Sequence, residues 1–192
     1  MNWMNGFLAR ATSVAALGLS LMGLPAAAAD WSVDHTQSTL GFEASMNGTG
    51  FSGQFGRWTA TISFDPADLA ASKAEVSIDM TSAETGDGTR DAALPQPDWF
   101  DTDNFGTATF VASAFRSMGG DAYEADGTLT IRGTSKPVTL AFTLAIADGK
   151  AVMAGATTLN RGDFGVGQGE FAGDTPVALA VKVVVSIQAT AR

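Results

Sequence analysis

The chain of 192 residues has no cysteine and a single histidine, His35. Without cysteine it forms no disulfide, performs no thiol chemistry, holds no cysteine-ligated metal and carries no lipoprotein anchor, so its stability must come from its core. A Ser/His/Asp triad would depend on His35, and the adjacent Asp34 points to the opposite face if this segment is a strand. We therefore expect no catalytic residue, no metal and no cofactor.

Basic residues are also scarce. Lysine and arginine number 11 against 20 aspartates and glutamates, a net charge of −9. Such a charge repels phosphate backbones and anionic membrane surfaces, which argues against a nucleic-acid partner. The chain also lacks an apolar segment of the roughly 20 residues that a spanning helix needs, so we expect no stable membrane span.

The N-terminus has the composition of a secretory signal peptide. Arg10 precedes the apolar run Ala11–Leu24, and the small residues Ala27–Ala29 follow Pro25. This order of charged, apolar and small residues is the pattern that signal peptidase reads. The sequence thus predicts a cleavable signal peptide over residues 1–29 and a mature domain over residues 30–192.

Apolar residues in the mature part alternate with polar ones, and a period of two indicates β-strands. Turn sequences such as Asn47-Gly48, Asp126-Gly127 and Asp148-Gly149 separate these stretches and favour short antiparallel connections. The sequence therefore predicts an all-β fold. The alternating sets are Leu40, Phe42 and Ala44; Ala60, Ile62 and Phe64; Val76, Ile78 and Met80; Leu129 and Ile131; Val138 to Ile146; and Val177 to Ile187.

A sheet of about eight strands with one apolar face must pack on a second sheet or close into a barrel. Two segments interrupt the alternation, Pro66–Lys73 and Thr85–Phe105. In the second, Arg90–Leu94 is expected to form a helical turn that Pro95 stops. We place both segments at the barrel rim, where short helical segments are expected.

Several motifs resemble those of the YceI-like family, in the same order and at similar spacing along almost the whole mature chain. The most specific is the series Thr85-Gly86, Arg90-Asp91 and Asp98-Trp99-Phe100. The other matching pieces are Trp31–Asp34, Ser38–Phe42, Gly53–Phe55, Ile62–Pro66, Ala108–Phe110, Gly127–Val138 and Leu159–Gly165.

The resemblance implies a single antiparallel lipocalin-like β-barrel of about eight strands in the periplasm. It also implies a long-chain amphiphilic ligand, a polyisoprenoid or an isoprenoid quinone, held in the barrel interior. The residues expected to line this interior are Phe42, Phe64, Ile78, Met80, Trp99, Phe100, Phe110, Leu129, Ile131, Leu140, Phe142, Leu179 and Val181.

Charged residues at the rim are candidates for contact with a lipid head group. Arg90 with Asp91 and Arg161 with Asp163 have suitable chemistry, because a guanidinium binds carbonyl and phosphate oxygens. The alternative is structural, with these side chains bonding to loop backbone or to each other.

Three functions fit these observations. The first is a periplasmic lipid-binding or carrier protein. The second is a filled barrel that serves as an interaction or stress-response module. The third is an enzyme acting on a lipid-like substrate, for which His35, Asp34 and Asp91 are the candidate acids and bases. The sequence also allows a homodimer.

Overall fold

A computed structural model describes residues 28–192. The predicted signal peptide lies outside the described residues except for its last two, Ala28 and Ala29. Within the described part of the chain, no helix combines the length and the apolar character needed to cross a membrane.

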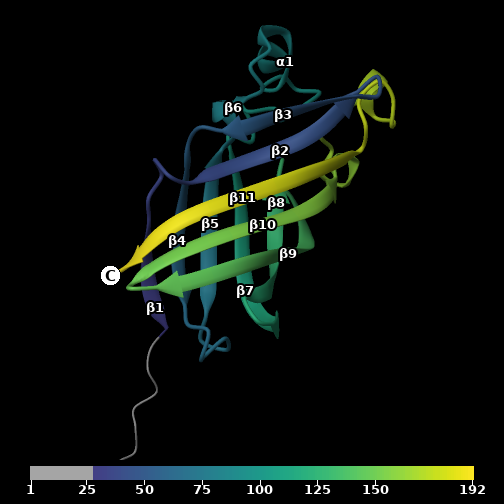
Figure 1. The fold of residues 1–192 in the computed structure, drawn as a ribbon. Coiled ribbons are helices and arrows are strands. Elements are labelled where there is room, and N and C mark those ends of the chain that lie inside the picture. The colour runs from purple at the N-terminus through teal and green to yellow at the C-terminus, as the bar shows by residue number, and fades with distance from the viewer. Residues whose placement is uncertain (1–27) are drawn as a thin grey trace, which may run out of the picture.

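The fold consists of antiparallel strands with short helical pieces between them (Figure 1). The strands are β1 (Ala29–Val33), β2 (Thr39–Met46), β3 (Thr49–Phe55), β4 (Trp58–Phe64), β5 (Lys73–Asp79), β6 (Ala83–Glu84), β7 (Thr107–Gly119), β8 (Ala122–Ile131), β9 (Thr134–Ala147), β10 (Lys150–Asn160) and β11 (Ala180–Ala191). The helical pieces are α1 (Gly88–Ala93) and the 3₁₀ turns η1 (Met80–Ser82), η2 (Arg161–Phe164) and η3 (Gly169–Phe171).

Three pairs of strands act as single bent strands. β1 with β2 runs antiparallel to β3 with β4, which in turn runs antiparallel to β5 with β6. Strands β7 to β11 continue the meander, and β11 pairs with both β1 and β2. The result is a closed antiparallel barrel of eight strands. The all-β barrel expected from the sequence is confirmed.

The two ends of the barrel differ in their connections. At one end, called here the α1 end, lie α1, the β2–β3 and β8–β9 turns and the long β10–β11 connection (Figure 1). At the other, the terminal end, lie both termini of the described chain and the β4–β5, β7–β8 and β9–β10 turns. Of the two predicted rim segments, Thr85–Phe105 lies at the α1 end and contains the expected helix, whereas Pro66–Lys73 lies at the terminal end.

The tight turns follow the sequence signals. Asn47 and Asp148 have positive φ and each precedes a glycine with positive φ. Two consecutive residues of this kind form the turn that matches the twist of a β-hairpin. Arg132-Gly133 makes the same kind of turn between β8 and β9, although arginine gives no such signal in the sequence.

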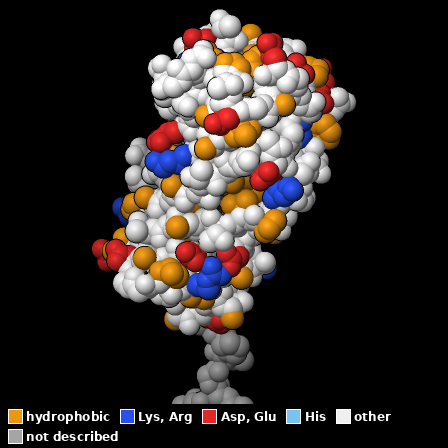
Figure 2. All heavy atoms as spheres, turned by 90° about the vertical axis from the view of Figure 1, so that its right-hand side faces the viewer, with side chains coloured by type: hydrophobic (Ala, Val, Ile, Leu, Met, Phe, Trp, Pro, Cys, Tyr) orange, Lys and Arg blue, Asp and Glu red, His pale blue; other side chains and the backbone are white. Residues whose placement is uncertain are grey.

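Several cations of the outer surface lie next to acidic side chains. Arg116 contacts Glu124 and Asp126, and Lys182 contacts Glu43 at 3.1 Å. On the face shown in Figure 2, the blue side chains likewise lie next to red ones and form no continuous basic patch.

Candidate ligand-binding cavity

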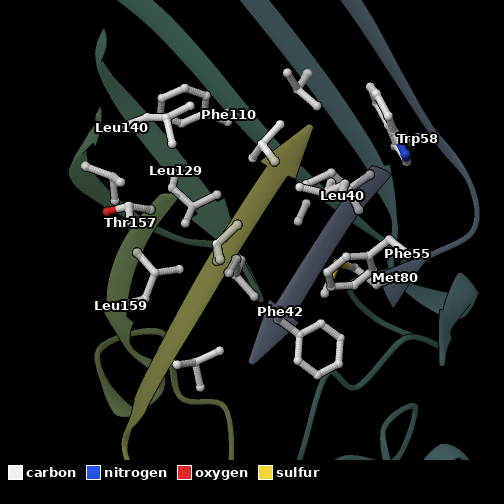
Figure 3. A pocket seen from close by; sticks show the side chains of 18 of the residues that line it. Leu40, Phe42, Phe55, Trp58, Met80, Phe110, Leu129, Leu140, Thr157 and Leu159 are labelled. Carbon is white, nitrogen blue, oxygen red and sulfur yellow. The ribbon is translucent and has the colours of Figure 1, made fainter. Parts of the chain in front are cut away.

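A cavity of about 690 Å³ occupies the barrel interior. Pockets that bind drug-sized molecules measure roughly 300–1,000 Å³. The side chains in Figure 3 converge on this space from several strands, and nearly all of them are apolar. Those labelled are Leu40, Phe42, Phe55, Trp58, Met80, Phe110, Leu129, Leu140, Thr157 and Leu159.

Cross-strand glycines keep phenyl rings close to the barrel wall. Phe42 faces Gly53 across β2 and β3, and Phe142 faces Gly155 across β9 and β10. A Cβ at Gly53 would lie 2.3 Å from Cζ of Phe42. The ring of Phe42 therefore occupies space that a side chain at position 53 would take, whereas Phe142 approaches Gly155 with its Cβ.

Aromatic packing fills the terminal end. The ring of Phe64 lies 5.3 Å from that of Phe115 and 5.6 Å from that of Tyr123, which stacks on Phe142 at 5.6 Å. The indole nitrogen of Trp31 donates a hydrogen bond of 3.0 Å to the carbonyl oxygen of Phe64. This end is apolar and held by edge-to-face contacts.

Polar groups line the cavity mainly at the α1 end. Among the described residues, the lining includes six side chains with hydroxyl, carboxylate or guanidinium groups, and four of them belong to the segment Thr85–Arg90. The six are Thr85, Asp87, Thr89, Arg90, Thr157 and Arg161.

Asp87 caps the N-terminus of α1. Its carboxylate accepts hydrogen bonds of 3.0 Å from the backbone nitrogens of Thr89 and Arg90 and lies 3.6 Å from the Arg90 guanidinium. The bond from the Arg90 backbone, followed by the charge of that side chain, lowers the pKa of Asp87. The cap fixes the segment that borders the mouth of the cavity, by which we mean its α1 end.

Arg90 is held at the mouth by neighbours within the protein. Its guanidinium lies 4.6 Å from the ring centroid of Phe51 on β3, and its Nε donates to the Thr85 hydroxyl at 3.2 Å. Asp91 does not line the cavity, because its carboxylate turns back to accept from the backbone nitrogen and hydroxyl of Thr85.

Arg161 is buried, with 5% of its surface exposed. It donates four hydrogen bonds to backbone carbonyl oxygens of the β10–β11 connection, at 2.7 to 3.0 Å. The acceptors belong to Val166, Gly173, Val177 and Ala178. Burial lowers the pKa of this guanidinium. Arg161 thus holds the β10–β11 connection together through bonds to loop backbone, which is the alternative to contact with a lipid head group. Asp163 does not line the cavity.

A third arginine fixes the neighbouring part of the rim, against which Arg161 packs. Nη1 of Arg132 donates to the carbonyl oxygens of Pro97, at 2.6 Å, and of Trp99. The ring of Trp99 packs 5.1 Å from that of Phe171 and covers the cavity from the α1 end. Both long connections therefore meet over the mouth.

Twelve of the thirteen apolar residues predicted to face the interior line the cavity, and Leu179 does not. Leu179 precedes β11 and instead lies near Gly162 in the rim. The alternation from Val177 to Ile187 extends past the start of the strand at Ala180, so the inward register does not apply to it. Lining residues outside the predicted set include Phe51, Phe55, Trp58, Phe115 and Leu159.

The YceI-like domain model matches residues 31–191. The chain belongs to the YceI-like family. A UPF0312 protein of Ectopseudomonas mendocina is 31% identical over 169 residues, which cover 83% of this chain and 88% of that protein. The crystal structure of Burkholderia cenocepacia BcnA matches with a TM-score of 0.80 and 32% identity, covering 83% of this chain and 100% of that chain.

The fold also recurs in a more distant structure. A polyisoprenoid-binding domain from Saccharophagus degradans, described as implicated in plant cell wall breakdown, matches with a TM-score of 0.66. It is 14% identical and covers 85% of this YceI-like chain and 99% of that chain. At this identity the match shows that the two share the barrel.

The three candidate acids and bases belong to two segments of this YceI-like chain, with Asp34 and His35 adjacent in sequence. His35 lies between β1 and β2 with its ring against Trp58, whereas Asp91 belongs to α1. Hydrogen bonds from the side chain and backbone of Thr36 lower the pKa of Asp34. Among the described residues, no three acidic or histidine side chains gather as a metal site would require.

Proposed function

We propose that this protein is an exported periplasmic carrier that holds a long-chain isoprenoid lipid, a polyprenol-like molecule or an isoprenoid quinone, in the barrel lumen. The observation that carries the proposal is the 690 Å³ cavity, whose wall is apolar except near one end. The ligand named for the Saccharophagus degradans domain suggests the isoprenoid class.

The energetics of such a site favour a flexible hydrocarbon. Burying each CH₂-sized unit gains about 0.8 kcal/mol, so a long chain binds without many hydrogen bonds. Methionines at positions 80 and 153 line the cavity, and their flexible thioethers adapt to irregular apolar ligands. Phe42, Phe64, Phe110 and Phe142 supply rings along the path.

The periplasmic location rests on the N-terminal sequence. The apolar run Ala11–Leu24 and the small residues before Asp30 are those of a cleavable export signal. Mass spectrometry of the mature protein from a periplasmic extract tests this point, with an N-terminus near Asp30 as the expected result. An uncleaved protein in the cytoplasmic fraction contradicts it.

The ligand itself is tested by native mass spectrometry of the protein from its own periplasm, followed by organic extraction. We expect a bound isoprenoid or quinone at close to one molecule per chain. A bare protein mass that stays unchanged after addition of polyprenols and quinones favours the filled-barrel interaction module.

Two adjacent residues of β10 offer a matched control for this experiment. Thr157 lines the cavity, whereas Thr158 is exposed on the outside of the barrel. Thr157→Phe places a ring in the lumen and is expected to remove most of the bound lipid. Thr158→Phe adds the same ring outside and is expected to leave the lipid in place. Equal lipid content in the two variants places the ligand outside the lumen.

A further inference from the structure

The barrel wall contains a stretch without backbone pairing. The β1–β4 ladder ends at the pair Trp31 and Ile62, and the β2–β3 ladder ends at Gly41 and Gln54. Between these pairs, residues 32–40 and 55–61 have no ladder bonds to each other, although their other edges pair with β11, β5 or β6. Side chains alone therefore close the wall at this place.

A small polar notch lies over this stretch, with a volume of about 170 Å³. We use the name lateral notch for the space lined by His35, Ser38, Thr39, Leu40, Gln54, Phe55, Gly56 and Trp58. His35 and Thr39 are exposed, whereas Leu40 is buried. The notch is thus an outer recess with an apolar floor.

The floor is shared with the lumen. Leu40, Phe55 and Trp58 line both the lateral notch and the large cavity. Figure 3 shows these three side chains grouped on one side of the cavity, across from Leu129 and Leu140. One layer of side chains, with no backbone ladder, separates the polar recess from the apolar interior.

The notch offers N–H and hydroxyl groups that are not engaged within the described part of the chain, unlike the guanidinium donors at the α1 end. Arg161 spends its donors on four backbone carbonyls, and Arg90 contacts Thr85, Asp87 and Phe51. In the notch, the indole N–H of Trp58, the His35 ring and the Thr39 hydroxyl make no side-chain hydrogen bond to another described residue. The His35 ring touches Trp58 edge to face at 4.6 Å.

The absence of charged side chains among the described residues that line the notch restricts the head groups that it can bind. Its lining contains no lysine, arginine, aspartate or glutamate, and the Gln54 amide nitrogen already donates to Glu84 at 2.6 Å. A diphosphate would lose hydration here without gaining a fixed cation, whereas a carbonyl or hydroxyl oxygen needs only a donor.

We propose that the lateral notch binds the uncharged, hydrogen-bonding head of an amphiphile whose chain passes between Leu40, Phe55 and Trp58 into the lumen. This proposal rests on the proposed function, since the lumen must hold the chain. It makes the gap between the bent strands, rather than the α1 end, the place where the head is recognised.

The single histidine provides a direct test. Its imidazole gives one set of NMR signals in the unmodified protein, so an assignment needs no variant. Decylubiquinone and decylbenzene share a C10 chain and differ in the carbonyl-bearing head. We expect saturating decylubiquinone to shift the His35 signals and decylbenzene to leave them close to those of the free protein.

Trp58→Phe supplies a second measurement, because it keeps an aromatic ring and removes the N–H donor. We expect the variant to weaken the binding of decylubiquinone about tenfold more than that of decylbenzene, because both chains contact the ring and only the quinone head loses a hydrogen bond. The notch is overturned as the head site if decylubiquinone binds without moving the His35 signals. It is also overturned if Trp58→Phe lowers the affinity for both ligands equally. A wild-type protein that binds neither compound contradicts the lipid-carrier function itself.

Discussion

Phe42 and Gly53 face each other across β2 and β3, and the phenyl ring lies where a Gly53 side chain would be. A Cβ at this glycine would also come within 2.7 Å of the carbonyl oxygen of Glu84, which is backbone and cannot swing away. The pair therefore couples the shape of the lumen to the pairing of β3 with β6.

Gly53→Ala is expected to destabilise the fold by about 1–3 kcal/mol, because both the ring and the backbone must shift to admit the methyl group. Gly50→Ala on the same strand is the control, since its Cβ would meet nothing closer than 4.0 Å. Urea unfolding measures both. Equal midpoints for the two variants contradict the tight contact at Gly53.

Arg161→Lys is expected to cost about 2–4 kcal/mol of stability, because an ammonium cannot reach all four carbonyls and leaves buried acceptors unpaired. Arg116→Lys is the matched control on the outer wall, where half of the arginine side chain is exposed, and it is expected to change stability by less than about 0.5 kcal/mol. Thermal and urea unfolding compare them. A small effect at both positions shows that the carbonyls of the β10–β11 connection find other donors.

Arg132→Ala is expected to loosen the rim over residues 97–105, since it removes the donor shared by Pro97 and Trp99. Hydrogen exchange should speed up at the amides of this segment and stay unchanged near Phe64 and Tyr123 at the terminal end. Uniform acceleration along the whole barrel points instead to a global loss of stability.

Lowering the pH is expected to weaken the hydrogen bonds by which the Asp87 carboxylate caps α1. The folded pKa of Asp87 lies below its ordinary value of 3.8, so the stabilisation is fully present above that value and is lost as the pH falls through the lower folded pKa. The amide signals of Thr89 and Arg90 should therefore titrate with a midpoint below 3.8. In Asp87→Asn, which keeps a capping oxygen but has no charge to lose, the Asp87-dependent step should vanish. A midpoint at or above 3.8 contradicts this account.

The alternation of apolar residues predicted β2, β4, β5, β8, β9 and β11 and gave no clear period for β1, β3, β7 and β10. Strands β9 and β11 present valine, leucine and phenylalanine at every second position, and their period is plain. Strand β3 contains Gly50 and Gly53, and β10 contains Gly155, which pairs with Phe142 on β9. These glycines, among them Gly53 beside the Phe42 ring, weaken the pattern that reveals a strand.

The residues of the cavity were largely predictable, but its openness was not. Inward positions follow from the period, whereas free volume depends on whether rings such as Phe110 lie along the wall or across the lumen. The rim charges show a similar limit. The sequence suggests Arg90 and Asp91 as a pair, yet adjacent residues on a helix point apart. Arg90 instead contacts Asp87, Thr85 and Phe51.

The double pairing of β11 has a consequence for the order of folding. Trp31 near the start of the described chain aligns with Ala191 near its end, and β2 pairs along the first half of the same strand. Contacts of such long sequence separation form late and slowly. Until the final twelve-residue strand is available, neither the closed wall nor the enclosed space can form, so an unfinished chain has nothing with which to retain a ligand.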